Sequence, residues 1–526
     1  MSRALILAML AVAAHATIAG QTLVVLRIRA VLTDATGGAT PVARHALLIS
    51  ENPATREPRR ILTGLDGAAN VRMSPGNYTI ESDEPLGFQG KAYRWRQTLN
   101  IPAGRDSALD LTVANAVIEP IAPETTDRGA PLPTDISLLL RQWLDSVVEL
   151  WTPTAHASGF LVDAAGLIAT SYRVMGDATS VEVQISRSIK VAGTVVAADP
   201  QRDIAIVRID PSAMASMRPV PLGCQRDSTP AVAQGQDIFA LAAPLRQQKD
   251  WTPATVNRAD ARIIASDLTV ATGGVGGPVF NASGELAGLT SLPDERDEPR
   301  RGATRVVRIE GACELVAAAT QKLKDAPAPS GTHLPVEPTE PAPVATFNDA
   351  VKRRAGSLKP YQIAASDFDV AFITPVLNYA AQSQSSQTFG NWSEYVVDIP
   401  PVLFVRVTPK MSESFWAKVA RGAAYTQGMA LPAFKRLKSG FQRLQAYCGS
   451  AEVTPIHPFK LELRVSETDA VYEGLYVFDP AALGPGCGKV TLVLYSEKEP
   501  AKADTRVIES TILQQIWRDF ELDGKR

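Results

Sequence analysis

A glycine-rich run, Gly273–Gly277, is the stretch of this 526-residue chain with the clearest capacity for chemistry. Successive backbone N–H groups in such a run can form a nest that accepts a carbonyl oxygen or an anion. The residue at its apex is Val275, whose side chain has no lone pair and no proton to give, so it cannot attack a carbonyl carbon. Glycine runs also make ordinary turns. Two interpretations therefore stay open: an oxygen-accepting nest at Gly273 and Val275, or a turn needed for packing.

Two upstream segments give this run a context. Ser158–Val174 reads Ser-Gly-Phe, a turn, a Leu-Ile-Ala-Thr strand and then Ser-Tyr-Arg-Val, and Asp199–Ile209 places an aspartate just before an apolar strand. With the glycine run, these segments resemble the HtrA-type members of the chymotrypsin-fold serine peptidases over about residues 134–324. The resemblance implies base, acid and nucleophile positions at Arg173, Asp203 and Val275, separated by 30 and then 72 residues.

The side chains at those positions contradict the activity that the resemblance implies. In a working triad an imidazole takes the serine proton, whereas a guanidinium stays protonated at any physiological pH. Losing nucleophile and base together costs on the order of 10⁶ in turnover. We therefore expect no functional catalytic residue, with Asp203 alone surviving of the three. The resemblance also implies that Arg173 and Asp203 approach each other, and we expect a bidentate pair within hydrogen-bond distance; the alternative is an Arg173 that points to solvent.

Other side chains offer no evident replacement for the missing groups. His156 is the one histidine of five inside this region, and its place beside a strand connection predicts a solvated loop residue. The hydroxyls of Thr272, Ser266 and Ser283 are near the glycine run in sequence but not at its apex. Catalysis needs sub-ångström placement, which chance neighbours seldom supply. No metal-ligand or nucleotide motif is present, so we expect no cofactor and no metal.

The composition and residues 1–20 limit the class of protein that this chain can be. The chain has 45% hydrophobic and 21% charged residues and a net charge of −2, which indicates a globular protein of about three domains with no preference for nucleic acid. Residues 1–20 have a positive start, a short apolar core and small residues at a cleavage site near residues 16–20, as in a secretory signal. No later stretch is long enough to span a bilayer. We expect a periplasmic or secreted protein.

Four widely spaced cysteines have no Cys-x-x-Cys pair, which disfavours zinc or a redox centre. In an exported protein they predict disulfides. Because two lie in the peptidase-like region and two near the C-terminus, we expect Cys224–Cys313 and Cys448–Cys487, although four cysteines permit three pairings.

The remaining chain predicts a multidomain, mainly β protein. Residues 21–114 have short alternating strands and turns, and their Asp-Gly turn and Pro-Gly-Asn-Tyr-Thr-Ile run are similar to carboxypeptidase-regulatory-like β-sandwiches. Residues 115–133 are a linker, 134–324 a double β-barrel of chymotrypsin type, 325–346 a proline-rich spacer and 347–526 an α+β domain. Phe88, Tyr93 and Trp95 could form a ligand platform, but core packing is the preferred interpretation. The expected helices are 136–151, 312–322, 413–423, 433–447 and 506–520.

These features lead to one preferred function and two alternatives. The preferred function is an exported, inactive relative of HtrA-type peptidases that binds a protein or peptide as a scaffold. The first alternative is an active serine endopeptidase with a non-standard catalytic arrangement, and the second is a purely structural envelope protein. No segment after residue 324 resembles the PDZ domain that usually follows this peptidase type. The sequence carries no signature that names the ligand or sets an oligomeric state.

Overall fold

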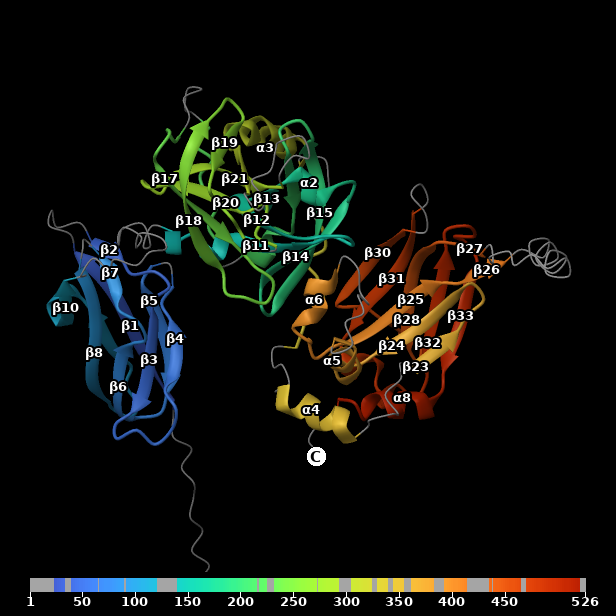
Figure 1. Cartoon of the computed structure of the whole chain (residues 1–526). Coiled ribbons are helices and arrows are strands. Elements are labelled where there is room, and N and C mark those ends of the chain that lie inside the picture. Colours follow the sequence, from blue (N-terminus) through green and yellow to red (C-terminus); the bar gives the residue numbers. More distant parts are fainter. Residues whose placement is uncertain are drawn as a thin grey trace, which may run out of the picture. The chain divides into compact units, whose positions relative to one another are not determined.

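The chain separates into two compact units, Met1–Gln142 and Trp143–Arg526, in the computed structural model (Figure 1). The signal-like residues 1–20 and most of the 115–133 linker lie outside the part of the chain that the structure describes. The predicted domain boundaries stay predictions. The described residues are 23–33, 39–64, 66–88, 91–120, 140–214, 217–224, 231–271, 273–292, 304–323, 329–338, 344–353, 361–382, 392–413, 435–437, 439–464 and 470–520.

The first unit contains two sheets that share one hydrophobic core, as a β-sandwich does. One sheet has the order β2-β1-β5 with β9 beside β1, and the other the order β10-β8-β6-β3-β4 with β7 beside β8. Alternating burial along β1 places its apolar side chains inside, as the period of a half-buried strand requires. The elements are β1 Val24–Thr33, β2 Ala39–Pro41, β3 Ala46–Glu51, β4 Arg59–Leu62, β5 Ala68–Met73, β6 Gly76–Ser82, β7 Leu86–Phe88, β8 Lys91–Ile101, β9 Ser107–Leu111, η1 Val113–Asn115 and β10 Ala116–Pro120.

The aromatic side chains of this unit belong to its core. Trp95 is fully buried, and its indole Nε1 donates a hydrogen bond to the Thr112 carbonyl at 2.8 Å. Tyr93 and Phe88 are buried as well. Core packing, rather than a ligand platform, is therefore the role of these three residues. The resemblance to carboxypeptidase-regulatory-like domains stays a prediction.

His45 makes the stability of the first unit depend on pH. Its ring is buried, with Nε2 3.0 Å from Ser82 Oγ, and burial lowers its pKa from 6.5 to about 4. Since the unfolded chain binds a proton at higher pH than the folded one, stability is lost as pH falls from 6.5 towards 4. The shift corresponds to about 3 kcal/mol. An NMR titration of the His45 ring should give a midpoint near 4, and a midpoint near 6.5 would contradict this.

The second unit begins with two closed six-stranded barrels, which confirm the predicted double β-barrel (Figure 1). Their strand orders are β11-β12-β13-β16-β15-β14 and β17-β18-β19-β22-β21-β20. The first barrel contains η2 Leu144–Ser146, β11 Val147–Trp151, β12 His156–Asp163, β13 Leu167–Thr170, α2 Tyr172–Met175, β14 Ser180–Ser186, β15 Ile189–Asp199 and β16 Ile204–Arg208. The connection and the second barrel contain η3 Pro211–Met214, β17 Asp237–Ala242, β18 Asp250–Ala259, β19 Ile263–Ser266, β20 Pro278–Asn281, β21 Leu286–Ser291, β22 Arg305–Arg308 and the helix α3 Glu310–Leu323.

Two elements of the barrels differ from the sequence prediction. The expected 136–151 helix is wrong over its C-terminal part, because Val147–Trp151 pairs with both β12 and β14 as strand β11. Strand β22 was not predicted; its four residues pair with β19 and β21 and close the second barrel. The helix expected at 312–322 is confirmed as α3.

The C-terminal part is α+β, as predicted, and its two larger sheets share one core with helix α8. The sheet orders are β23-β24-β25-β31-β30, β29-β28-β32-β33 and β26-β27. Its elements are α4 Val344–Arg353, β23 Tyr361–Ala364, β24 Phe368–Ile373, α5 Pro375–Gln382, α6 Ser393–Val397, β25 Leu403–Pro409, β26 Met411–Glu413, β27 Lys435–Leu437, β28 Phe441–Cys448, β29 Ala451–Val453, β30 His457–Arg464, β31 Ala470–Phe478, η5 Pro480–Leu483, η6 Pro485–Cys487, β32 Val490–Ser496, β33 Ala503–Ile508 and α8 Ser510–Trp517.

Three helices were expected in this part, and the structure agrees with them to different extents. The 433–447 helix is wrong, because its described residues include strand β27 and most of strand β28. The 506–520 helix is confirmed only over Ser510–Trp517, which form α8, and its first residues are the end of β33. The 413–423 helix lies outside the described residues apart from Glu413, which ends β26.

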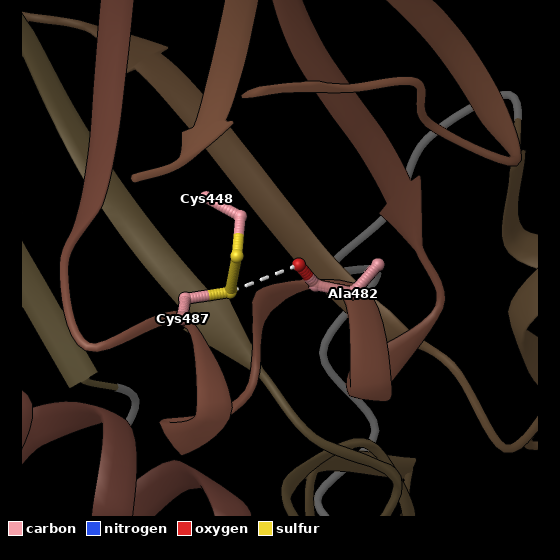
Figure 2. Close-up of a disulfide and its surroundings, with 3 residues drawn as sticks. All are labelled: Cys448, Ala482 and Cys487. Atoms are coloured by element: carbon pink, nitrogen blue, oxygen red, sulfur yellow. Dashed lines mark hydrogen bonds between the residues drawn. A yellow bond between two sulfur atoms is a disulfide. The ribbon is translucent and has the colours of Figure 1, made fainter. Parts of the chain in front are cut away.

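Both predicted disulfides are present. Cys224–Cys313 joins the connection between the barrels to α3, and Cys448–Cys487 joins the end of β28 to η6. Figure 2 shows the second bond, with Cys487 Sγ 3.3 Å from the Ala482 carbonyl oxygen. Because a disulfide sulfur carries no proton, this is a sulfur–oxygen contact and not a donated hydrogen bond. Within the described residues, no helix is long and apolar enough to cross a membrane.

Candidate functional site

The glycine run leads from the second barrel into β20 and passes against the first barrel. Gly273 and Gly276 have φ of 82° and 93°, in the left-handed region that favours glycine. A Cβ at Gly276 would overlap the Ser158 carbonyl oxygen and Thr170 Oγ1. The Ser158 N–H donates to the Val275 carbonyl at 2.8 Å, which ties the apex of the run to β12. Positive φ and close backbone approach therefore explain why these positions are glycine.

Two buried hydroxyls brace the run from opposite sides. Ser158 Oγ donates to the Gly273 carbonyl at 2.7 Å and accepts the Ala243 N–H at 2.9 Å. Thr290 Oγ1 donates to the Gly274 carbonyl at 2.9 Å and accepts the Gly277 N–H at 3.0 Å. Each hydroxyl uses both its proton and a lone pair, so the run has a fixed conformation at low entropic cost.

The backbone donors at the apex stay uncommitted within the described part of the chain. The hydrogen bonds there include donation by the Gly274 and Gly276 N–H groups, to Ala271 and Thr290, but none by Gly273 or Val275. These last two are the donors that an oxygen-accepting nest would use. The close packing supports the turn interpretation and the uncommitted donors support the nest, so the nest stays a prediction.

Asp203 accepts hydrogen bonds from three donors although no imidazole or serine stands at the other two positions. It is 1% exposed and has φ of 53°, an uncommon conformation for a non-glycine residue. Its Oδ1 accepts Ser171 Oγ at 3.0 Å and the Arg173 N–H at 2.8 Å, and its Oδ2 accepts Ser291 Oγ. The carboxylate is thus held in place by its neighbours in the fold, independently of an imidazole.

Arg173 approaches Asp203 less closely than predicted. Its Nε lies 3.8 Å from Asp203 Oδ2, and Nη1 lies 3.5 Å from the Leu292 carbonyl. The pair is therefore an ion pair, and the expected bidentate hydrogen-bonded geometry is wrong. The physical reason is that the two serines and the Arg173 backbone N–H occupy three of about four carboxylate lone pairs, which leaves too few for a bidentate guanidinium but enough for a single N–H donor. The Arg173 side chain is 30% exposed, so it is not a freely solvated side chain either.

Val275 is half-buried and packs against the hydrophobic core of the first barrel. The nearby hydroxyls considered as substitutes have other partners: Ser266 Oγ accepts the Leu268 N–H at 3.3 Å, and Ser283 lies in the turn after β20, where its N–H donates to Asn281. Thr272 lies outside the described residues. None of these contacts couples a hydroxyl to an imidazole.

His156 is buried, so its prediction as a solvated loop residue is wrong. Its side chain is 4% exposed, and its ring contacts Trp151 in a tilted arrangement, with ring centroids 4.1 Å apart and planes 43° apart. A Cβ at Gly273 would overlap its Nδ1, which places the imidazole against the glycine run. Nε2 lies 3.5 Å from Glu149 Oε2, and neither ring nitrogen makes a hydrogen bond within the described residues. The ring is covered by Trp151 and by the glycine run at Gly273, and the second of these is 117 residues away in the sequence.

Behind His156, the C-terminal part packs on the first barrel through an aromatic cluster. Trp151 also contacts His457 with centroids 4.1 Å apart and planes tilted by 30°, so His156, Trp151 and His457 form a row of neighbouring rings. Trp392, Tyr395 and Phe459 complete the cluster around Trp151. The Lys460 N–H donates to the Pro153 carbonyl at 2.9 Å beside it. A series of ring contacts thus leads from the glycine run to strand β30 of the C-terminal part.

A buried network of charges, which sequence analysis missed, surrounds this cluster. Lys190 is fully buried; its Nζ lies 3.0 Å from Glu182 Oε2 and donates to the Ile456 carbonyl. His457 Nδ1 lies 2.8 Å from the same Glu182 oxygen. Burial lowers the pKa of Lys190 despite the opposing charge of Glu182. Burial would raise the pKa of Glu182, but the hydrogen bond from His457 and the charge of Lys190 outweigh it and lower that pKa.

A second ion pair joins the proline-rich segment to the second barrel, close to the aromatic cluster. Arg246 binds Glu337 through Nε and Nη2, each at 2.8 Å, and its Nη1 donates to the Tyr395 carbonyl at 2.7 Å. The segment also forms an isolated bridge between His333 and Val191. The predicted spacer is therefore packed against the barrel over its described residues. No local signal could have revealed these pairs, because their partners are up to 275 residues apart.

A comparison with protein families gives one match in this region. Residues 157–289, which lie within the two barrels, match the family described as "Trypsin-like peptidase domain". In the described residues, no group of three or more His, Cys, Asp or Glu side chains is placed to hold a metal.

The relatives of this domain are HtrA-type peptidases. The chain is 28% identical over 167 residues to Protease Do-like 1, chloroplastic, of Arabidopsis thaliana, covering 30% of this chain and 37% of that protein. It is 30% identical over 152 residues to Serine protease HTRA2, mitochondrial, of Bos taurus, covering 27% and 32%. It is 26% identical over 166 residues to a probable periplasmic serine endoprotease DegP-like of Pseudomonas fluorescens, covering 30% and 33%.

The chain spans about a third of the length of these relatives. Among solved structures, a serine endoprotease from Yersinia pestis shares 21% identity, with coverage of 36% of this chain and 68% of that one and a TM-score of 0.31.

Proposed function

We propose that this chain is an exported protein whose trypsin-like domain binds a protein or peptide without cleaving it. The observation that carries the proposal is the pair of residues at the base and nucleophile positions. Arg173 cannot accept a proton at physiological pH, and Val275 has no atom that can attack a carbonyl. Asp203 nevertheless keeps three donors, and Ser158 and Thr290 still brace the glycine run. The scaffold of the site is retained while its reacting groups are absent.

The two alternative functions have less support. A non-standard active endopeptidase needs a hydroxyl next to a base, and the contacts of Ser266 and Ser283 supply none. A purely structural protein would not need uncommitted N–H groups at Gly273 and Val275. Export is supported by the signal-like residues 1–20, by the two disulfides and by a relative whose name includes "periplasmic".

The absence of turnover is tested with a fluorophosphonate probe, which reacts with activated serines. We expect no labelling of the native protein above that of a heat-denatured sample, and no cleavage of unfolded casein. Specific labelling of one serine in the native protein would overturn the proposal.

Binding is tested with fluorescein-labelled unfolded casein and the variant Gly273→Ala. This change adds a Cβ that overlaps His156 Nδ1, so it should distort the nest and weaken binding at least tenfold. The matched control is Gly235→Ala: Gly235 has nearly the same φ, 81° against 82°, but nothing lies within 4 Å of its added Cβ. Circular dichroism confirms that both variants fold. Equal binding by the two folded variants would contradict a role for the glycine run.

A further inference from the structure

The C-terminal part meets the first barrel through an interface that holds charged groups beside aromatic rings. Trp151 of β11 contacts His457 of β30 with ring centroids 4.1 Å apart. The Lys460 N–H of the same strand donates to the Pro153 carbonyl at 2.9 Å, which bonds the edge of the C-terminal sheet to the β11–β12 turn. Each of the two disulfides lies within one of these parts, so neither crosses the interface.

The proline-rich segment holds the same interface from a second side. The Leu334 N–H donates to the Lys190 carbonyl at 2.7 Å, which attaches the segment to strand β15. Glu337 accepts two hydrogen bonds of 2.8 Å from Arg246 of the second barrel, and a third from the Tyr395 hydroxyl. Arg246 has a φ of 55°, an uncommon conformation for a residue other than glycine. Glu337 is thus a clasp between the second barrel and helix α6 of the C-terminal part.

The His457 ring is 1% exposed, and titratable groups from four elements face it. Its Nδ1 lies 2.8 Å from Glu182 Oε2 of β14, and Lys190 Nζ of β15 lies 3.0 Å from the same oxygen. The Tyr395 ring of α6 lies edge-on at 5.6 Å, and the charge of Glu337 acts from the segment. Burial and the positive charge of Lys190 lower the pKa of His457 below 6.5, against the effects of Glu182 and Glu337. The docked ring is therefore neutral at neutral pH.

The interface also leaves two indole nitrogens without hydrogen bonds. The Trp151 and Trp392 rings come from opposite sides of the interface, with centroids 6.1 Å apart. Within the described residues, Nε1 of each ring is buried and makes no hydrogen bond. A buried polar group without a partner has lost its hydration, and it regains that hydration when water enters. The two indoles therefore favour separation, and the balance depends on His457 and on the Glu337 clasp.

We propose that the C-terminal part is a pH-controlled cover of the first barrel, which docks at neutral pH and separates in mild acid. In the separated state the His457 ring is solvated and binds a proton at its ordinary pKa of 6.5, whereas the docked ring binds one only at lower pH. The separated state thus binds more protons, so it gains population as pH falls below 6.5. Separation would uncover Trp151, which covers His156 beside the glycine run. This property is independent of whether a peptide binds there.

The test follows amide hydrogen exchange of the full chain at about pH 7.5 and about pH 5.5, with rates corrected for the intrinsic effect of pH. We expect about tenfold faster exchange in acid for peptides that contain the Lys460 N–H, because separation breaks its bond to Pro153. Strands β12 and β13 should stay protected, which distinguishes separation from unfolding of the barrel. Small-angle X-ray scattering should give a larger radius of gyration in acid, and a return to neutral pH should reverse both changes.

Two variants should move the separation in opposite directions. His457→Gln keeps an N–H that can donate to Glu182 but cannot gain a proton, so it should stay docked at about pH 5.5. Its matched control is His333→Gln, because the His333 ring is exposed, and this variant should separate as the unaltered chain does. Glu337→Gln weakens the clasp and should separate at a higher pH than the unaltered chain.

Three results would overturn the proposal. The first is exchange of the Lys460 amide that does not rise in acid. The second is a His457→Gln chain that separates at the same pH as His333→Gln. The third is an unchanged separation pH in Glu337→Gln, which decides the matter if His457→Gln does not dock at neutral pH.

Discussion

The chain with Arg173→His and Val275→Ser together is expected to react with a fluorophosphonate probe at residue 275. Asp203 already accepts hydrogen bonds from Ser171, Ser291 and the backbone N–H of residue 173. An imidazole at 173 would therefore meet a carboxylate fixed in position, which is what sets its tautomer in a working triad. A general base contributes about 10²–10⁴-fold, so we expect at least a hundredfold more labelling than in the unaltered chain.

Three further variants separate the two restored groups. Val275→Ser alone has a hydroxyl without a base, and Arg173→His alone has a base without a nucleophile. Arg173→His with Val275→Ala matches the loss of valine contacts with the first-barrel core but supplies no hydroxyl. All three should label at the level of the unaltered chain. If the restored double variant is as inert as the alanine control, then the glycine run does not hold residue 275 in an attacking position.

The barrel was predictable because its strands are short, apolar and separated by turns, and because three motifs stand in a fixed order. The disulfide pairing followed from the position of two cysteines in each region. The Phe441–Cys448 strand was taken for a helix for a specific reason. The register shifts at a bulge between Phe441 and Arg443, so Phe441 and Leu444 are both buried three residues apart, as on a helix face. A bulge changes the period that sequence patterns depend on.

The charged residues of the second unit could not be predicted for a different reason. Lys190 is a lysine in a strand, and lysine is almost always exposed unless it is paired. Its partners reach it through tertiary structure: Glu182 comes from the next strand of the barrel, whereas His457 and the Ile456 carbonyl come from the C-terminal part. The sequence around His156 is typical of an exposed turn, whereas its ring packs on Trp151 and on the distant Gly273. Local pattern carries no information about such contacts.

Replacing Glu182 by alanine is expected to lower the free energy of unfolding of the second unit by about 3–5 kcal/mol, since it leaves the buried Lys190 charge without its carboxylate. Urea unfolding followed by tryptophan fluorescence measures this, because Trp151 and Trp392 lie in the adjoining aromatic cluster. The control is Arg258→Ala, which breaks an exposed pair and should cost less than about 1 kcal/mol.

The double variant Glu182→Ala with Lys190→Met distinguishes an unpaired charge from a simple loss of packing. Removing both charges leaves no buried ion, so the double variant should be more stable than Glu182→Ala alone.

Lowering the pH should also reduce the stability of the second unit, as Glu182→Ala does. Burial lowers the pKa of His457 below 6.5, and the network lowers that of Glu182 below 4.5. Their contributions are therefore present at neutral pH and are lost as pH falls through these values, first that of His457 and then that of Glu182. If Glu182→Ala with Lys190→Met is no more stable than Glu182→Ala, then Lys190 is already neutral at pH 7. The aromatic contacts from His457 to His156 would then join the C-terminal part to the first barrel without a contribution from this charge.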